Sequence, residues 1–407
     1  MKAVIADLFS QAALEELRSH GIECFYDHTL EGANLLEVLA AERPHILVVR
    51  STKVTANVIQ AAPTLELIVR AGAGTDNIDT AEASRRGIYV TNCPGKNSIA
   101  VAELVMGLIC AVDRRIPENV MLLRQGKWNK GMFSTSTGLK GRKLGIIGLG
   151  NIGREVAARA RSFGMAIFGF DPMLSAEQTE ALGISYLPTP EALAHEVDIM
   201  TFHVPSNPKT KGMINAQFLA QCKDDCVLVN TSRGDLVNED ELLSVLEARP
   251  GLWYACDVYK GEPAGKDGDF VHRIAQHPRV YGTHHIGAST KQAEQAIGEE
   301  AVRVILKYSR TRKVDQANCV NLVQLSPANY SITIRAQNTP GILAFALNKM
   351  AEVGYNVQEV ESVVFKDAMA CSASVNFTAT SAERVEEVVA AIQAHAGVIN
   401  VVCLPRA

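Results

Sequence analysis

Residues 143–153, KLGIIGLGNIG, place three glycines between an apolar run and a stretch of helical periodicity, REVAARARSFG. In a strand–turn–helix unit, Gly148 allows a tight turn, Gly150 lets the backbone approach a pyrophosphate, and Gly153 lets helix and strand pack closely. The helix start offers free N–H groups to phosphates. The next apolar run ends at Asp171, whose carboxylate suits the ribose hydroxyls of NAD and repels the extra phosphate of NADP. The pattern predicts a Rossmann-type NAD site.

Apolar runs alternate with amphipathic segments on both sides of this unit. Five runs before it are expected to be strands: KAVIA, IECFY, HILVVR, LELIVR and IYVT. Five more follow it: MAIFGFD, DIMTFHV, CVLVNTS, LWYACDV and RVYGTH. This alternation predicts an α/β fold with parallel sheets and helices on both faces. Long helices are expected from Ser98 to Arg114 and from Thr290 to Ser309.

The pattern changes after a polar stretch, residues 309–329, which predicts a linker. From Tyr330 the order reads strand, helix, strand, strand, helix, strand. This βαββαβ order predicts a separate small module over residues 330–407.

Composition excludes several classes of protein. The 407 residues suffice for two or three domains, and the net charge of −4 gives no basic footprint for nucleic acid or an anionic membrane. The longest apolar run, 99–112, is interrupted by Glu103 and is too short to span a bilayer. The N-terminal residues look like a strand rather than a signal peptide, so a cytoplasmic location is expected.

Nine cysteines at irregular spacings predict reduced thiols rather than disulfides. Cys222 and Cys226 could supply two metal ligands on one helical face. No second pair follows at a suitable spacing, so no metal is expected.

Three ionisable residues follow expected strands of the second α/β run: Arg233 in NTSRGDLV, Glu262 in DVYKGEP and His285 in THHIGAST. Ligands bind at the carboxyl ends of strands in such sheets, so the three side chains can converge. A guanidinium can hold a carboxylate by directed hydrogen bonds. An imidazole can take a hydroxyl proton, and a carboxylate can orient it. These are the roles that oxidation of a 2-hydroxy acid requires.

The segments GLGNIG, FDP, NTSRGDLV, DVYKGEP and HIGAST resemble the D-isomer-specific 2-hydroxyacid dehydrogenases. The resemblance extends over nearly the whole chain, including RAGAGTDNID and NCPGKNSIAVAEL. It implies a Rossmann-type NAD-binding domain, residues 98–288, inserted into a flavodoxin-like substrate-binding domain of residues 1–97 and 289–325. The implied reaction is NAD-dependent oxidation of 3-phospho-D-glycerate to 3-phosphohydroxypyruvate, the entry step of serine synthesis, by a cytoplasmic homotetramer.

The resemblance also implies roles for individual residues. His285 is the acid/base, Glu262 orients it and Arg233 anchors the substrate, while His284 stands where a proline is common and is expected to be solvated. The implied cofactor positions are Gly148, Gly150, Asn151, Ile152, Gly153, Asp171, Val204, Thr231, Asp257 and Ala288. The implied substrate positions are Arg50, Ser51, Arg70, Ala73, Gly74 and Lys130. Arg50 and Arg70 could bind a phosphate or be solvated strand-end charges, and Lys130 could reach a neighbouring subunit.

The C-terminal module resembles an ACT domain, a regulatory module that binds small molecules such as L-serine. Asn338 and Asn356 match the expected effector positions, and a short amide at each can hydrogen-bond an amino acid. Ala336 stands where some relatives carry a histidine. Serine feedback or an altered affinity are both consistent with this departure.

Two other functions remain open at this point. A reductase for hydroxypyruvate, glyoxylate or D-lactate would need neither Arg50 nor Arg70. An NAD-sensing scaffold, as in corepressors that share this fold, could retain the triad, but the ACT-like module argues against it.

Overall fold

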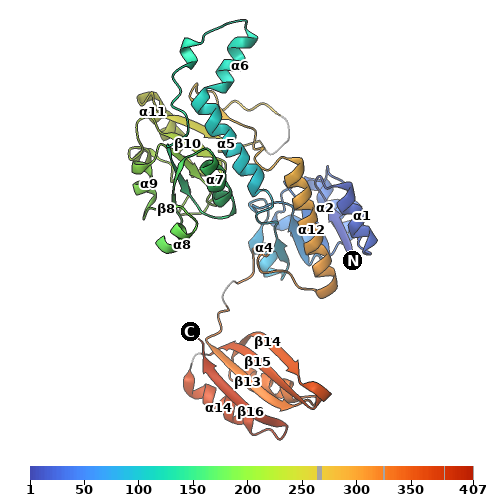
Figure 1. The fold of residues 1–407 in the computed structure, drawn as a ribbon. Helices are drawn as coiled ribbons and strands as arrows, with labels where there is room; N and C mark the ends of the chain where they lie inside the picture. The colour runs from blue at the N-terminus through green and yellow to red at the C-terminus, as the bar shows by residue number, and fades with distance from the viewer. Residues whose placement is uncertain (264–267, 324–325, 380, 407) are drawn as a thin grey trace. The chain divides into compact units, whose positions relative to one another are not determined.

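The computed structural model describes residues 1–263, 268–323, 326–379 and 381–406. The chain forms two compact units, Met1–Asn321 and Leu322–Ala407 (Figure 1). The ends predicted for two domains, residues 325 and 407, lie outside the described residues. Among the described residues, no helix is both long enough and apolar enough to cross a membrane.

A five-stranded parallel sheet begins the first unit. Its strands are β1 (Lys2–Ile5), β2 (Glu23–Tyr26), β3 (Ile46–Val49), β4 (Leu67–Arg70) and β5 (Tyr89–Thr91), in the order β2-β1-β3-β4-β5. This is the flavodoxin order. Its helices are α1 (Gln11–Ser19), α2 (Gly32–Glu42), α3 (Ala56–Ala61), α4 (Thr80–Arg85) and α12 (Lys291–Thr311). Buried side chains of α1 and α12 pack on one face, and those of α2, α3 and α4 pack on the other.

A seven-stranded parallel sheet follows in the same unit. Its strands are β6 (Lys143–Ile147), β7 (Ala166–Phe170), β8 (Ser185–Tyr186), β9 (Ile199–Phe202), β10 (Val227–Asn230), β11 (Trp253–Cys256) and β12 (Val280–Gly282). The order β8-β7-β6-β9-β10-β11-β12 is that of a Rossmann fold with one added strand. The strand order reverses between β6 and β9, and a crevice for ligands is expected there.

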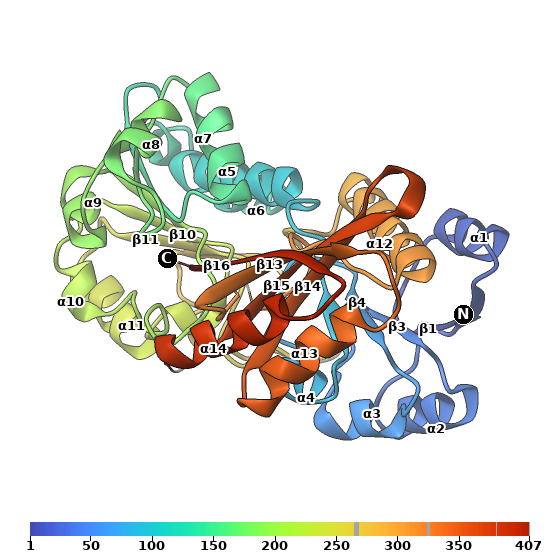
Figure 2. The ribbon, with the colours of Figure 1, turned by 90° about the horizontal axis from the view of Figure 1, so that it is seen from below.

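Helices cover both faces of this second sheet. They are α5 (Ser98–Arg114), α7 (Asn151–Ser162), α8 (Ala176–Ala181), α9 (Pro190–Glu196), α10 (Ala216–Leu219) and α11 (Glu239–Ala248). Helix α6 (Ile116–Arg124) follows α5 and buries none of its residues, and short 3-10 turns lie at η1 (Gly131–Phe133) and η2 (Gly234–Leu236). Helices α5 and α7 lie on one face and α9, α10 and α11 on the other (Figure 2), and their buried residues form two separate core clusters. The predicted α/β class is confirmed.

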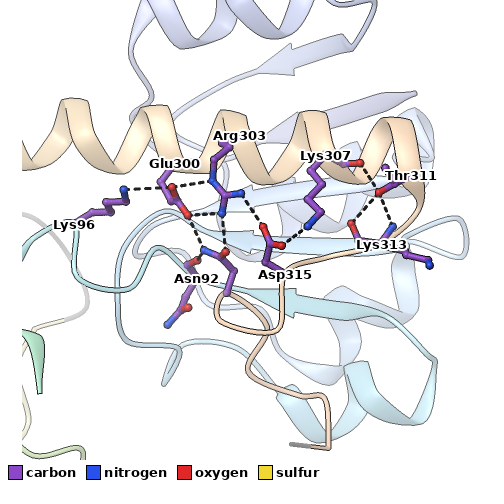
Figure 3. Close-up of polar contacts among 9 residues, drawn as sticks. Asn92, Lys96, Glu300, Arg303, Lys307, Thr311, Lys313 and Asp315 are labelled. Atoms are coloured by element: carbon purple, nitrogen blue, oxygen red, sulfur yellow. Dashed lines mark hydrogen bonds and ion pairs between the residues drawn. The ribbon is translucent and has the colours of Figure 1, made fainter. Parts of the chain in front are cut away.

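A polar network around Glu300 ties α12 to the loop before α5 and to the segment after α12 (Figure 3). The Glu300 carboxylate accepts hydrogen bonds from Arg303 at 2.7 Å and from Asn318 Nδ2 at 2.8 Å. Lys96 Nζ lies 3.4 Å from the same carboxylate. The bonds from Arg303 hold the pKa of Glu300 at about 2, against the opposing effect of burial.

Residues 318–321 run along β5. The Val320 N–H donates to the Val90 carbonyl at 2.9 Å, and the Asn321 side chain accepts from the Val90 N–H and donates to the Ile88 carbonyl, both at 2.9 Å. The prediction of a linker over residues 309–329 was therefore wrong for the first half of that stretch. Polar composition suggested an unattached segment, but its amides and backbone bond to the first unit, which ends at Asn321.

The second unit has the predicted βαββαβ order. Its elements are β13 (Tyr330–Gln337), α13 (Ile342–Glu352), β14 (Asn356–Val364), the 3-10 turn η3 (Lys366–Ala368), β15 (Ala370–Thr378), α14 (Ala382–Gln393) and β16 (Val398–Pro405). The strands form an antiparallel sheet in the order β14-β15-β13-β16. Alternate residues of β13 and β15, such as Ile332 and Val375, are buried against α13 and α14. This architecture is compatible with an ACT domain.

Candidate active site

The glycine turn joins β6 to α7 at the point where the strand order reverses. Gly148 has φ +91°, and a methyl group there would lie 2.4 Å from the His203 carbonyl oxygen. A methyl group on Gly153 would lie 2.1 Å from the Gly148 carbonyl oxygen. Both positions therefore require glycine. Gly150 faces open space, with no atom within 4 Å of such a methyl group, so a pyrophosphate can approach the backbone there.

Asp171 lies beside the glycine turn, at the end of β7. Its carboxylate accepts from the Leu149 N–H at 2.8 Å and from the Met173 N–H at 2.9 Å. These two bonds hold the carboxylate next to the turn, where it can accept from ribose hydroxyls.

Several buried polar atoms without partners lie just after β9 and β10 and at the start of α5. Among the described residues, Thr231 Oγ1, His203 Nδ1, Asn97 Oδ1 and Ser98 Oγ are buried and have no hydrogen-bond partner. Buried polar groups are normally satisfied, so such atoms indicate a missing partner. A dinucleotide carries enough donors and acceptors to bond with them. The expected NAD positions Asn151, Ile152, Val204 and Ala288 lie in the first turn of α7, after β9 and in the loop before α12.

His285 and Glu262 form the expected pair. His285 Nδ1 lies 2.7 Å from Glu262 Oε2, and Glu262 Oε1 accepts from the Tyr259 N–H at 2.7 Å. The hydrogen bond to Glu262 raises the pKa of His285 above its ordinary value, although burial opposes this. Burial pushes the pKa of Glu262 upward, but the bonds from His285 and Tyr259 outweigh it and lower that pKa. The pair therefore favours a charged histidine beside a carboxylate.

Asp257 holds the loop that carries His285. Its carboxylate accepts from Thr283 Oγ1 at 2.6 Å and from the N–H groups of Ile286 and Gly287, both at 2.8 Å. His285 has φ +51°, a left-handed conformation that is rare for a side chain other than glycine. Asp257 was predicted to line the cofactor site, and the structure gives its carboxylate this further use.

Three arginines, Arg50, Arg70 and Arg233, gather where the two sheets face each other. Burial, together with the charges of Arg233 and Arg50, lowers the pKa of Arg70 to about 10. Arg70 Nε is buried and has no hydrogen-bond partner among the described residues. A buried guanidinium without a counter-ion is costly, so the cluster is suited to an anion.

The guanidinium groups of Arg70 and Arg233 pack directly against glycine residues. A methyl group on Gly72 would lie 1.5 Å from Arg70 Nη1, and one on Gly74 would lie 2.0 Å from Arg233 Nη2. The small residues of AGAG therefore make room for arginine side chains. Ala73, between them, is fixed through its carbonyl, which accepts from Asn92 Nδ2 at 2.5 Å.

Arg50 and Ser51 already have partners. Arg50 Nη1 lies 3.0 Å from Glu294, and the Ser51 hydroxyl donates to Asp7 at 2.9 Å. Asp7 also accepts from the N–H groups of Arg50, Ser51 and Thr52. Lys130 lies just before η1, and within the described residues no contact joins it to the arginines.

Some residues of the site were missed by the sequence analysis. Asp7, which orders the loop after β3, stands at the end of β1 and could have been found by its place after a strand. His203 stands after β9, bonds Thr201 Oγ1 through Nε2 at 2.9 Å, and is kept neutral because burial lowers its pKa to about 3. Asp76 is the third residue that was missed. It pairs with Arg233, which lies in a distant segment of the chain, so no local pattern indicates it.

Comparison with known proteins agrees with this geometry. Residues 106–287 match the model of the D-isomer specific 2-hydroxyacid dehydrogenase, NAD binding domain. The chain is 39% identical over 300 residues to the D-3-phosphoglycerate dehydrogenase of Homo sapiens, covering 74% of this chain and 55% of that protein. The chain thus spans little more than half the length of that curated relative.

Two solved structures are also similar. One is a putative D-isomer specific 2-hydroxyacid dehydrogenase from Polaromonas sp., with a TM-score of 0.67 and 31% identity, covering 78% of this chain and 99% of that one. The other is the NAD+-bound 3-phosphoglycerate dehydrogenase of Entamoeba histolytica, with a TM-score of 0.64 and 26% identity, covering 77% and 97%.

The chain belongs to the D-isomer-specific 2-hydroxyacid dehydrogenase family. It carries that family's NAD-binding domain, so the predicted class of cofactor is confirmed. Its resemblance to D-3-phosphoglycerate dehydrogenases is confirmed as a similarity of sequence.

Proposed function

We propose that the protein oxidises 3-phospho-D-glycerate to 3-phosphohydroxypyruvate with NAD. The observation that carries this proposal is the cluster of Arg50, Arg70 and Arg233. A substrate with a carboxylate at one end and a phosphate at the other gives these cations two anions to bind. Glu294 and Asp76 pair with Arg50 and Arg233, but Arg70 Nε has no hydrogen-bond partner among the described residues, so a second anion on the substrate has a cation to bind.

The residues divide the chemistry as follows. Bound NAD would supply the acceptor for the hydride that leaves C2. His285 Nδ1 faces Glu262, so Nε2 is the atom that takes the proton of the C2 hydroxyl. Glu262 stabilises the imidazolium that results, and Arg233 holds the substrate carboxylate. In the reverse direction His285 returns the proton to the carbonyl oxygen.

The remaining expectations follow from the same proposal. Residues 1–97 and 289–325 form the substrate-binding domain, and residues 98–288 form the NAD-binding domain. Residues 330–407 form an ACT-type regulatory domain in which Asn338 and Asn356 bind L-serine. The active form is a cytoplasmic homotetramer that acts in serine synthesis, with Lys130 reaching a neighbouring site.

The test compares two substrates in the reductive direction. NADH oxidation is measured with 3-phosphohydroxypyruvate and with hydroxypyruvate at matched concentrations, with and without millimolar L-serine. The expected result is a preference for the phosphorylated substrate of at least about 100-fold in kcat/KM, because the phosphate adds charge-assisted hydrogen bonds. Equal rates would contradict the phosphate role and point to a general hydroxyacid reductase. An unchanged rate with serine would contradict the regulatory part alone.

A further inference from the structure

The side chain of Arg233 is held from the opposite side of the site by Asp76, in the connection between β4 and α4. Arg233 Nε donates to Asp76 Oδ2 at 2.7 Å, and Arg233 Nη2 lies 2.7 Å from the same oxygen. Arg233 Nη1 donates to the Ser232 carbonyl at 2.7 Å. Within the described residues, two of the five guanidinium N–H groups thus donate hydrogen bonds to the protein, and Nη2 adds an ion-pair contact to Asp76. N–H groups on both Nη atoms remain available to a carboxylate.

The segment that carries Asp76 is anchored. The Asn77 side chain donates to the Thr52 carbonyl at 2.7 Å, and the Asn77 carbonyl accepts from the Val54 N–H at 2.8 Å. Asp79 begins α4 by accepting from the Glu82 N–H at 2.9 Å. With Asn77 and Asp79 fixed, the segment that follows Asp76 is anchored, and this gives the Asp76 carboxylate a defined position from which to orient a partner.

The ion pair between Asp76 and Arg233 contributes little to the stability of the fold. The Asp76 side chain is 65% exposed, and exposed ion pairs contribute little to stability. Gly74 lies against the same Arg233 atom, so the guanidinium is confined between a glycine and a carboxylate. Both contacts restrict where Arg233 can point.

We propose that Asp76 is a positioning residue, which fixes the guanidinium of Arg233 so that its free N–H groups face the substrate carboxylate. The inference rests on the proposed function only in that Arg233 must bind a carboxylate. Asp76 does not have to leave when substrate arrives, because it uses the Nε side of the guanidinium.

The experiment is a double-mutant cycle of Asp76→Asn and Arg233→Lys. Asp76→Asn is expected to lower kcat/KM by roughly 10-fold, mostly through a higher KM, because a misplaced guanidinium binds the carboxylate less well. Added to Arg233→Lys, the same change is expected to cost less than about 2-fold, because its partner is already lost. Asp76→Glu is expected to recover part of the activity. Asp27→Asn is the matched control in the same sheet domain, and it is expected to change nothing.

A purely structural role for Asp76 predicts additive losses in the cycle, and that outcome would overturn the inference. So would an Asp76→Asn variant with unchanged or lower KM, which would make Asp76 a competitor of the substrate. NADH affinity, followed by fluorescence, is expected to be the same in every Asp76 variant, and a loss there would also overturn it.

The same cycle is repeated on binding of oxalate, a two-carbon dicarboxylate, to the enzyme–NADH complex. If the effects on oxalate binding are non-additive but the enzyme does not turn over 3-phosphoglycerate, the proposed substrate is wrong and the positioning role of Asp76 is still supported. Additive oxalate binding in an enzyme that does turn over 3-phosphoglycerate would overturn the role of Asp76 alone.

Discussion

His285 presents Nδ1 to Glu262 at 2.7 Å while the backbone of His285 itself is held in a left-handed conformation by Asp257. Backbone strain in this loop thus orients the His285 imidazole toward Glu262, although His284 and His285 are both exposed. Because Glu262 raises the pKa of His285, the charge of this pair sets the pH dependence of the reaction.

Glu262→Gln is expected to lower the pKa of His285 and to reduce kcat on the order of 100-fold. Oxidation needs neutral His285, so its kcat/KM rises with pH through this pKa, and the variant should move that rise to lower pH. Reduction needs charged His285, so its fall with increasing pH should also move to lower pH. Profiles of kcat/KM in both directions check this. His284→Gln is the control, and a profile that shifts there and not in Glu262→Gln would assign the proton transfer to His284.

Gly74→Ala is expected to reduce kcat/KM by at least about 10-fold while the protein still folds. The added methyl group would lie 2.0 Å from Arg233 Nη2, so the guanidinium must move. The matched control is Gly107→Ala in α5, where the methyl group meets open space and alanine favours the helix. Steady-state kinetics and circular dichroism distinguish the two. Equal activity of the two variants would show that Arg233 tolerates displacement.

Asp171→Ser is expected to lower the preference for NAD over NADP by roughly 10- to 100-fold. The change removes a charged acceptor of the ribose hydroxyls, worth about 1.5–3 kcal/mol, and removes repulsion of the 2′-phosphate. The ratio of kcat/KM for the two cofactors measures it. A preference that stays the same would show that Asp171 acts only on the Leu149 and Met173 N–H groups.

Glu300→Gln is expected to destabilise the first unit by roughly 1–3 kcal/mol at pH 7, because Arg303 and Asn318 lose a charged acceptor. The pKa of Glu300 is lowered on folding to about 2, so its contribution is present above the ordinary carboxyl pKa and is lost as the pH falls toward 2. The difference in unfolding midpoint from the native chain should therefore shrink in acid. Glu299→Gln, on the exposed neighbour, is the control, and an equal loss there would contradict the prediction.

Much of the fold could be predicted because local signals and tertiary structure agree. Helix α5 was expected from Ser98 to Arg114 and begins and ends at those residues, since apolar residues recur along its whole length. The glycine turn was predicted from strand, turn and helix in sequence, and the structure leaves no room for a side chain at Gly148 and Gly153. His285, Glu262 and Arg233 follow strands that end at one edge of a parallel sheet.

The rest depended on contacts between distant segments. Asp76 and Arg233 are far apart in the sequence, and neither segment alone indicates the other. Arg70 was expected at a strand end, but its burial over Gly72 depends on the packing of the whole sheet. The anchoring of Asn318 and Asn321 escaped prediction because amides in a polar stretch carry no periodic signal.

The strand-like run of residues 318–321 also covers β5, the edge strand of the first sheet. Without it, β5 would expose unpaired backbone groups, and such an edge can recruit a strand from another molecule. We therefore expect the segment that leads toward the second unit to lower the tendency of the first unit to aggregate. A shortened protein that ends at Asn321 should keep this cover, and one that ends at Arg312 should lose it.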